Sequence, residues 1–388
     1  MEKVIYIGFQ PITSNFYSNF YVDKCIDKGL EVEYWDITQL YFPNINFGEP
    51  FDFEGVKHIK SFNQLKSFLS LVEMKSSIFI IHITYCFMAL RLFLILSAYN
   101  CPLAFFGRGM HPAPERTMTL KFREVILSLD YKRFIRGIGS WIAATLKQNK
   151  IVKNYDFIFS AGSEGYKTTG VGYQLDVTKG RVINVNYFDY DKYLDSLHGN
   201  PIIERAYCVF LDEYLPYHPD VAITGIKTVV ADNYYMQLNK FFDFIENKYD
   251  LKVIIAAHPK AFKYKSDNPF DGRTIIFNRT CELVRDSEFV MTHHSTSMSF
   301  PILFKKPILF ITSQAQKILM SIYYELTFFF GEYLNCQVIH FDNFESKEDF
   351  KFFVDVEKYD SYKYKYLTSK ESENRISSEI FIETISKL

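Results

Sequence analysis

The stretch KVIIAAHPK, residues 252–260, decides the predicted fold of this chain. A short apolar run ends at a polar His-Pro pair, which is typical of a buried strand that ends in a loop. Two further stretches have the same form, VFLDEY at residues 209–214 and FVMTHHSTS at residues 289–297. Because the carboxyl ends of parallel strands meet at one edge of a sheet, we expect the polar residues of all three stretches to lie close together. The sequence therefore predicts a parallel α/β sheet with a polar site at its edge.

The same alternation of short β-rich runs and helical stretches extends over the whole chain. The runs predicted to be strands are residues 4–9, 31–36, 78–83, 103–106, 157–160 and 182–185, and then 208–211, 252–256, 274–276, 289–291 and 307–311. Helices are predicted, among others, at residues 18–28, 88–99, 118–150 and 298–304. The pattern is Rossmann-like, but Gly8-Phe9-Gln10-Pro11 follows the first strand where a dinucleotide-binding protein has Gly-x-Gly-x-x-Gly. A dinucleotide-dependent oxidoreductase is therefore disfavoured.

The length of 388 residues suits two domains, and a polar join at residues 198–201 is the predicted hinge. We expect an N-terminal Rossmann-like domain over residues 1–198 and a C-terminal Rossmann-like domain over residues 199–345. Residues 346–388 are expected to form helices that pack back on the body. Two such domains are expected to bind a ligand in the cleft between them.

Composition excludes several classes of partner. The formal net charge is -1, so no overall field recruits nucleic acid, and no nucleic-acid partner is expected. The six cysteines are scattered without a Cys-x-x-Cys pair, and the start MEKVIYIGF is predicted to be a strand and not a secretory signal. These features predict reduced thiols and a cytoplasmic location.

Two segments bear on membrane contact. Residues 77–99 are apolar enough to suggest a membrane span, but His82 and Arg91 lie within them, so a buried strand followed by a buried helix is the preferred interpretation. Residues 131–153 combine aromatic and aliphatic side chains with six lysines and arginines. This amphipathic segment either packs on the core with a solvated charged face or lies on an anionic membrane surface.

The polar residues after the three strands of the second domain have the chemistry of a group transfer. Asp212 or Glu213 can accept a proton from a hydroxyl, and His258, aimed by Pro259, can assist the departure of a phosphate. The nucleotide phosphate would be held by hydroxyls and amides at the start of the following helix, at His294, Ser295, Thr296 and Ser297. Each feature alone also has an ordinary structural interpretation as a turn, a loop or a helix cap. A second His-Pro at residues 218–219 lies in a polar loop, and His258-Pro259 is preferred over it.

Candidates in the first domain are expected on the substrate side of the site. They are Gly107, Arg108 and Gly109 after one predicted strand, and Ser163 and Glu164 after another. Arg108 could meet an acceptor or an acidic sugar carboxylate, or it could be a surface residue of a tight loop. The tandem His293-His294 has no partner at metal-ligand spacing, so neither a metal nor a bound cofactor is expected.

The three motifs together resemble those of bacterial sialyltransferases and polysialyltransferases. Asp212 and Glu213 match that family's acidic pair, the first resembling its general base. His258-Pro259 matches its His-Pro motif, and Ser295-Thr296 matches its phosphate-binding hydroxyls. Tyr214 stands where the family has glycine.

The resemblance implies a GT-B fold and an inverting, metal-independent transfer. The donor would be a CMP-activated nonulosonic acid such as sialic acid, and the acceptor a surface polysaccharide or glycolipid at the inner face of the membrane. Three alternatives remain open: a GT-B transferase that uses a UDP- or other NDP-sugar, a sugar-nucleotide epimerase of the same fold, and a non-catalytic scaffold for glycan assembly.

Overall fold

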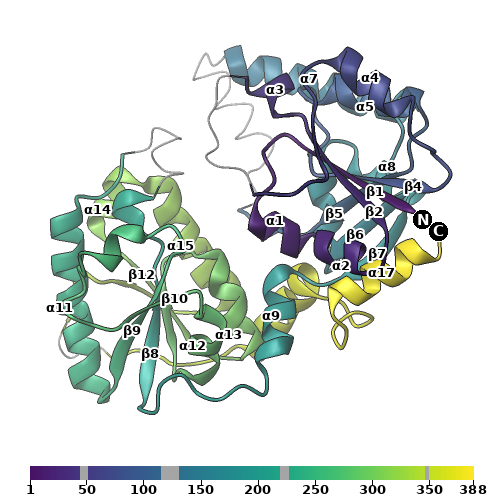
Figure 1. The fold of residues 1–388 in the computed structure, drawn as a ribbon. Coiled ribbons are helices and arrows are strands. Elements are labelled where there is room, and N and C mark those ends of the chain that lie inside the picture. Colours follow the sequence, from purple (N-terminus) through teal and green to yellow (C-terminus); the bar gives the residue numbers. More distant parts are fainter. Residues whose placement is uncertain (44–50, 115–130, 219–226, 346–348) are drawn as a thin grey trace. The chain divides into compact units, whose positions relative to one another are not determined.

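The computed structural model describes residues 1–43, 51–114, 131–218, 227–345 and 349–388, without the side chains of residues 131–136. The chain divides into two compact units (Figure 1). The first unit contains residues 1–111, 115–188 and 368–388, and the second contains residues 112–114 and 189–367. Each unit is built on one sheet, and every strand pair in both sheets is parallel. The prediction of two Rossmann-like domains is confirmed.

The sheet of the first unit has seven strands in the order β3-β2-β1-β4-β5-β6-β7. The strands are β1 (Lys3–Gly8), β2 (Glu31–Asp36), β3 (Val56–His58), β4 (Ser77–Ile81), β5 (Leu103–Gly107), β6 (Phe157–Ala161) and β7 (Arg181–Val185). The chain moves outward from β1 in one direction and then returns to add β4 on its other side. Such a reversal of strand order is where open α/β sheets bind ligands, just beyond the carboxyl ends of the strands.

Helices cover both faces of this sheet. They are α1 (Ser14–Asn19), α2 (Val22–Asp27), α3 (Thr38–Tyr41), α4 (Phe62–Leu69), α5 (Leu90–Ala98), α7 (Tyr131–Gln148), η1 (Gly165–Thr169), α8 (Tyr173–Lys179) and α17 (Ser377–Ser386). Successive side chains of a strand point to opposite faces. Accordingly, Ile5 and Ile7 belong to the core under α4 and α5, whereas Val4 and Tyr6 belong to the core under α1, α2 and α17.

The sheet of the second unit has six strands in the order β10-β9-β8-β11-β12-β13. The strands are β8 (Tyr207–Leu211), β9 (Lys252–Ala257), β10 (Ile275–Phe277), β11 (Val290–Thr292), β12 (Ile308–Thr312) and β13 (Val338–His340). Here the strand order reverses between β8 and β11. The polar ends of the three stretches that predicted the site thus follow β9, β8 and β11, which are neighbours at the centre of the sheet.

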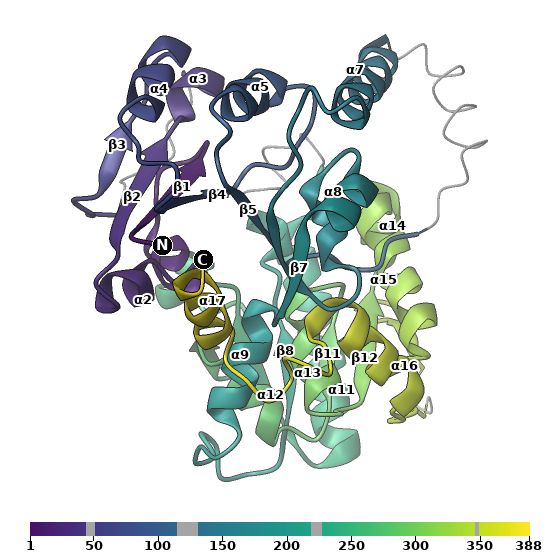
Figure 2. The same cartoon turned by 90° about the vertical axis from the view of Figure 1, so that its right-hand side faces the viewer.

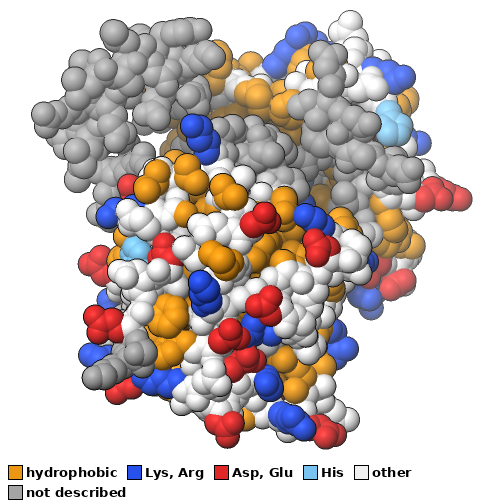
Figure 3. All heavy atoms as spheres, turned by 90° about the vertical axis from the view of Figure 1, so that its left-hand side faces the viewer, with side chains coloured by type: hydrophobic (Ala, Val, Ile, Leu, Met, Phe, Trp, Pro, Cys, Tyr) orange, Lys and Arg blue, Asp and Glu red, His pale blue; other side chains and the backbone are white. Residues whose placement is uncertain are grey.

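The helices of the second unit also lie on both faces. They are α9 (Phe188–Ser196), η2 (Leu215–Tyr217), α11 (Ala231–Tyr249), η3 (Phe262–Lys265), α12 (Thr280–Asp286), η4 (Thr296–Met298), α13 (Ser299–Leu303), α14 (Gln314–Leu319), α15 (Ser321–Leu334), α16 (Val356–Tyr362) and η5 (Lys363–Leu367). Phe210 packs in the core that includes α11, and Val209 in the core that includes α12 and α13. On the face shown in Figure 3, acidic and basic side chains are interspersed over this unit.

The end of the chain returns to the first unit, where α17 completes the core. Phe381 is fully buried there and packs on Phe106 and Phe159, with ring centroids 5.2 and 5.0 Å apart. Figure 2 shows the two termini next to each other, and the Met1 amino group donates a hydrogen bond to the carbonyl of Ile385 at 3.2 Å. The first unit therefore takes its last part, residues 368–388, from beyond the second unit, and the main part of the second unit begins at Asp189, before the predicted hinge.

Some helices differ from those predicted. The single helix expected over residues 18–28 is two short helices, α1 and α2, because Tyr21 adopts a left-handed conformation (φ 62°) between them. The helix expected from residue 118 is described only as α7, since residues 115–130 lie outside the described part of the chain. Within the described ranges, no helix combines the length and the apolar character that a membrane span needs.

Candidate functional site

The tips of β8, β9 and β11 meet at the point where the strand order of the second sheet reverses. Leu211 pairs with Ala256 of β9 and with Thr292 of β11. The Asp212 amide continues the ladder by donating to the Ala256 carbonyl at 3.1 Å. The side chains that follow these strands therefore share one edge, as the sequence predicted.

Asp212 is a deeply buried carboxylic acid of this edge. Its residue is only 4% exposed, and loss of hydration raises the pKa of its carboxyl group from 3.8 to about 7. The amides of Tyr214 and His258 and the hydroxyl of Tyr264 favour the ionised form, but their effect is smaller than that of burial. Neither carboxylate oxygen makes a hydrogen bond of ordinary geometry with any described residue, and both are shielded from solvent. Asp212 is therefore a carboxyl group that gains and loses its proton near neutral pH.

Tyrosines surround Asp212, and the sequence did not predict them as site residues. The Tyr264 hydroxyl of η3 lies 2.8 Å from the Tyr235 hydroxyl of α11, and burial together with the charge of Asp212 raises the pKa of both phenols. Both phenols are therefore protonated at neutral pH and can supply O–H donors near the carboxylate. Nothing in the local sequence marks these two residues in a chain with 28 tyrosines.

Tyr214 has a left-handed backbone, with φ 54° and ψ 34°. This is the conformation that glycine adopts at no steric cost, and it costs other residues about 1–2 kcal/mol. The side chain offsets part of this strain by packing on Tyr264, at an edge-to-face centroid distance of 5.1 Å, and on Tyr217 at 5.4 Å. The turn after Asp212 therefore has a backbone conformation that favours glycine, although tyrosine occupies it.

Glu213 connects the tips of β8 and β11 across the point of reversal. Its Oε1 accepts a hydrogen bond from the His294 amide at 2.7 Å, and its Oε2 lies 3.2 Å from Nδ1 of the same histidine. Burial raises the pKa of Glu213, while burial and the nearby His218 lower the pKa of His294 to about 4. His294 is thus neutral at pH 7, and Glu213 holds the β11 loop in place.

His258 follows β9 and is partly exposed. Its Nδ1 accepts a hydrogen bond from the Lys260 amide at 3.2 Å, which favours the tautomer with the proton on Nε2. The ring lies edge-to-face against His218, with centroids 4.8 Å apart. His218, of the less favoured His-Pro pair, therefore belongs to the same cluster as His258. The exposed Pro259 follows in the same turn.

The segment after β11 forms a short capped turn. The Ser295 hydroxyl accepts a hydrogen bond from the Ser297 amide at 3.2 Å, and the Ser295 carbonyl accepts one from the Met298 amide at 3.1 Å. Thr296 is exposed, and α13 behind the turn has only five residues. Of the amides expected to face a phosphate, that of Ser297 thus has a partner inside the turn, and that of His294 donates to Glu213.

His293 is a core residue. Its Nδ1 lies 2.6 Å from the Ile311 carbonyl and its Nε2 2.8 Å from the Tyr234 hydroxyl, so both ring nitrogens are engaged. Burial lowers its pKa, which keeps the ring neutral. Among the residues that the structure describes, no three His, Cys, Asp or Glu side chains gather at metal-binding distance.

The substrate-side candidates lie in the first unit. Gly107 ends β5, where a Cβ would come within 2.6 Å of the Gly165 carbonyl oxygen, so only glycine fits this approach of two backbones. Arg108 is buried, and Gly109 has a positive φ of 110°. In the next loop Ser163 is exposed and Glu164 forms an ion pair with Lys167.

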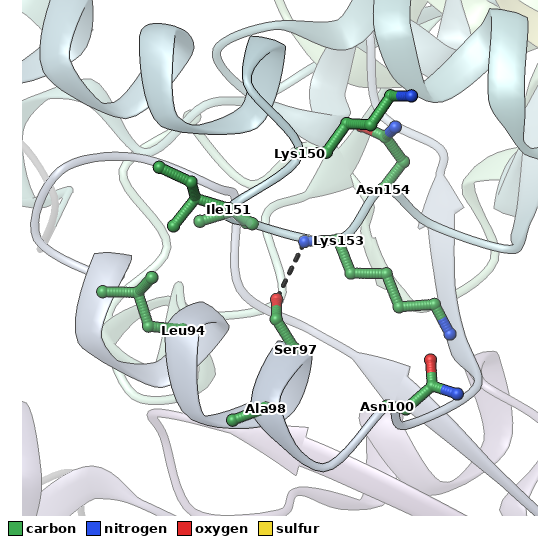
Figure 4. A pocket seen from close by; sticks show the side chains of 9 residues that line it. Leu94, Ser97, Ala98, Asn100, Lys150, Ile151, Lys153 and Asn154 are labelled. Carbon is green, nitrogen blue, oxygen red and sulfur yellow. Dashed lines mark hydrogen bonds between the residues drawn. The ribbon is translucent and has the colours of Figure 1, made fainter.

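A separate cavity of the first unit lies at the opposite edge of its sheet, before β5 and β6 (Figure 4). It is lined by the end of α5 and by residues 150–154, and the Lys153 amide donates to the Ser97 hydroxyl at 2.8 Å. The Lys153 ammonium group is occupied by Asp156 and by the Cys101 carbonyl, both at 2.8 Å. This cavity contains none of the predicted site residues.

Comparisons with known proteins give matches of fold at low identity. No protein-family model and no curated protein matches the chain. Among solved structures, it is similar to a UDP-GlcNAc 2-epimerase from Methanocaldococcus jannaschii in complex with UDP-GlcNAc and UDP, with 12% identity, 100% of this chain and 99% of that chain covered, and a TM-score of 0.44. It is also similar to MurG from Acinetobacter baumannii, with 7% identity, full coverage of both chains and a TM-score of 0.46. The glycotransferase of kitacinnamycin has 8% identity, coverage of 99% and 98%, and a TM-score of 0.48. The likeness to these structures is one of fold alone.

Proposed function

We propose that this protein is a GT-B-type, inverting glycosyltransferase that needs no metal and transfers a sugar from a nucleotide donor to a glycan or glycolipid. The observation that carries the proposal is Asp212, a buried carboxyl group with a pKa of about 7 at the reversal point of the second sheet. A general base works best when its pKa lies near the working pH. The neighbouring His258, His294 and Ser295 supply the groups that would face a phosphate.

In the proposed reaction, Asp212 takes the proton of an acceptor hydroxyl while the hydroxyl oxygen forms a bond to the anomeric carbon of the donor. The bond from that carbon to the phosphate oxygen breaks, and its electron pair leaves with the nucleotide. His258 donates Nε2–H to the departing phosphate, whose charge is stabilised without a metal. Glu213 positions the β11 loop through the His294 amide. Because both oxygens of Asp212 are covered, the proposal requires that acceptor binding exposes them.

The donor proposed first is a CMP-activated nonulosonic acid, supported by the His-Pro and Ser-Thr motifs alone. A UDP- or other NDP-sugar is the alternative, since neither motif distinguishes one nucleobase from another. A ligand that binds only the folded state raises its stability, so CMP, UDP, GDP and dTDP can be compared by thermal shift. The largest shift is expected with CMP. A clear preference for UDP would reject the CMP-sugar donor and leave the transferase open.

A sugar-nucleotide epimerase could use the same cluster of acids and histidines, and incubation with the donor alone separates the two functions. Only an epimerase changes the sugar without an acceptor. Transfer is expected to survive EDTA, and loss of activity that Mg²⁺ or Mn²⁺ restores would contradict a metal-independent mechanism. A folded chain that binds nucleotide and carries out neither reaction would favour the scaffold.

The acceptor is proposed to be presented at the inner face of the membrane. In support, α7 carries Trp141, which is 68% exposed, and Ile138, and the exposed Ile151 and Lys150 follow the helix. An exposed aromatic side chain beside basic residues suits the surface of an anionic bilayer. Sedimentation with vesicles of anionic and of neutral lipid tests this, and binding that Trp141→Ser does not reduce would count against it.

A further inference from the structure

A pocket of the first unit lies where its own strand order reverses. It has a volume of about 530 Å³. Its lining includes residues at the end of β5 and residues in the segments that follow β1, β4 and β5. Its lining includes six phenylalanines, among them Phe16, Phe20, Phe106 and Phe188, and the polar residues His82 and Arg108. The location is the one at which open α/β sheets bind ligands.

Arg108 is a buried cation of this pocket without an acidic partner. It is only 8% exposed, and no carboxylate within the described residues forms an ion pair with it. One terminal nitrogen donates to the Tyr21 hydroxyl at 2.5 Å and the other to the Asn19 carbonyl. The buried Nε has no hydrogen-bond partner among the described residues.

Buried charges in proteins are normally paired, because an unpaired charge in a poorly hydrated site is unfavourable. Around Arg108 the partial compensation comes from ring faces. The guanidinium carbon lies 3.9 Å from the centroid of Phe188, 4.8 Å from Phe106 and 5.3 Å from Phe20. The rings contact the guanidinium group, but among the described residues no anion pairs with the N–H donors in its plane.

The rest of the lining neither neutralises Arg108 nor competes with it. Among the residues that the structure describes, no aspartate or glutamate lines the pocket. Loss of hydration and the charge of Arg108 lower the pKa of His82 to about 4, so its ring is neutral at pH 7 and can exchange hydrogen bonds with a hydroxyl. The His82 ring contacts Phe16 and Phe20, at centroid distances of 5.0 and 4.6 Å. The pocket therefore combines one positive charge with aromatic walls and a neutral polar group.

We propose that this pocket binds an anionic sugar, with Arg108 pairing with its carboxylate or phosphate group and the aromatic rings packing on its apolar ring face. Only the assignment of this anionic sugar to the acceptor rests on the proposed function. Binding itself needs neither the donor nor Asp212.

The test is a binding titration without nucleotide, with three probes of similar size: glucuronic acid, glucose 6-phosphate and neutral glucose. The wild type is expected to bind at least one charged probe 10-fold or more tightly than glucose. A preference for glucuronic acid would identify a carboxylate, and one for glucose 6-phosphate a phosphate. Arg108→Gln is expected to abolish the preference and Arg108→Lys to keep part of it.

The matched control is Arg91→Gln, which removes another arginine of the same unit that stacks on an aromatic ring, 4.2 Å from the centroid of Phe62. This variant is expected to bind like the wild type. In case Arg108→Gln does not fold, the ring-proton resonances of the wild type provide a second measurement. The charged probe should shift the His82 resonance at pH 7 and leave that of His58 unchanged.

The inference is overturned if neither charged probe binds the wild type better than glucose, or if folded Arg108→Gln keeps the preference. Nucleotide binding is measured in parallel. If the protein binds nucleotide but shows no preference for charged sugars, the pocket proposal alone is rejected. If it binds charged sugars but no nucleotide, the proposed transferase function alone is rejected.

Discussion

Asp212 and Glu213 are adjacent in sequence, but their surroundings give them different roles. Glu213 is held by the His294 amide at 2.7 Å, whereas Asp212 faces the tyrosine hydroxyls without a hydrogen bond of ordinary geometry to the described residues. A carboxylate held by a strong hydrogen bond is a poorer proton acceptor than one that is desolvated and weakly bound. This contrast favours Asp212 as the base and Glu213 as a positioning residue.

Substitution separates these roles. Asp212→Asn is expected to lower kcat by roughly 10²–10⁴-fold, the range for a positioned base, and to leave nucleotide affinity nearly unchanged. His258→Ala should weaken both turnover and nucleotide binding, because it removes a phosphate contact as well as the donor to the leaving group. Ser295→Ala should act mainly on binding, by about 1 kcal/mol. Steady-state kinetics and nucleotide titrations check all three variants. Full turnover in Asp212→Asn together with loss in Glu213→Gln would move the base to Glu213.

Asp212 should also make activity dependent on pH. Since the base acts in its ionised form, kcat/KM is expected to fall about 10-fold per pH unit below the apparent pKa of about 7. The profile of the wild type from pH 5 to pH 9 checks this expectation. A profile that is flat between pH 5 and pH 7 would show that Asp212 does not limit the reaction.

Stability gives an independent measure of the same carboxyl group. The folded-state pKa of Asp212 lies above its unfolded value, so the fold favours the protonated form. The contribution of Asp212 to stability is therefore complete below about pH 4 and is lost as the pH rises to about 7. Asp212→Asn keeps the shape without the charge and should be more stable than the wild type by an amount that grows over this window and is constant above it. Denaturant unfolding at several pH values measures it, and a less stable variant at pH 8 would mean that the carboxylate is a structural cap.

At the scale of elements, the turn between β8 and η2 depends on the backbone of Tyr214. Tyr214→Gly and Tyr214→Ala remove the same ring, but only glycine accepts φ 54° without strain. The glycine variant is therefore expected to be the more stable of the two by about 1 kcal/mol. The matched control is Lys240, an exposed residue within α11, where alanine should be more stable than glycine by a similar amount. The same order at both positions, measured by urea unfolding, would contradict a left-handed Tyr214.

The strands and their shared edge were predictable because each is a short apolar run that ends at polar residues, and parallel order follows from the alternation with helices. Helix boundaries were less predictable, since Tyr21 breaks a helix through a backbone conformation that tyrosine rarely adopts. Within the site, Asp212, Glu213 and His258 each follow a strand, so their positions could be inferred. The positions of Tyr235 and Tyr264 could not, because these residues approach Asp212 from α11 and η3 through tertiary packing.

At the scale of the whole molecule, unfolding of the first unit can be measured separately by tryptophan fluorescence, because both tryptophans, Trp35 and Trp141, belong to it. Phe381→Ala removes a fully buried ring from the core between α17 and the first sheet, and such truncations destabilise by about 3–5 kcal/mol. We expect it to lower the midpoint of the tryptophan fluorescence transition. The matched variant Phe242→Ala leaves a cavity in the core of the second unit. It should lower the midpoint of the circular dichroism transition and leave the fluorescence midpoint unchanged. Equal shifts of both signals in both variants would mean that the units unfold together.

The return of the chain to its first unit has a consequence for biosynthesis. A ribosome translates residues 1–188 early, but it translates the helix that covers Phe106 and Phe159 only after the second unit. The second unit, nearly continuous in sequence, can fold on the nascent chain before that helix emerges from the ribosome. The first unit, although it is translated first, is completed after the second, and until then an apolar face of its sheet is exposed to chaperones and to other nascent chains.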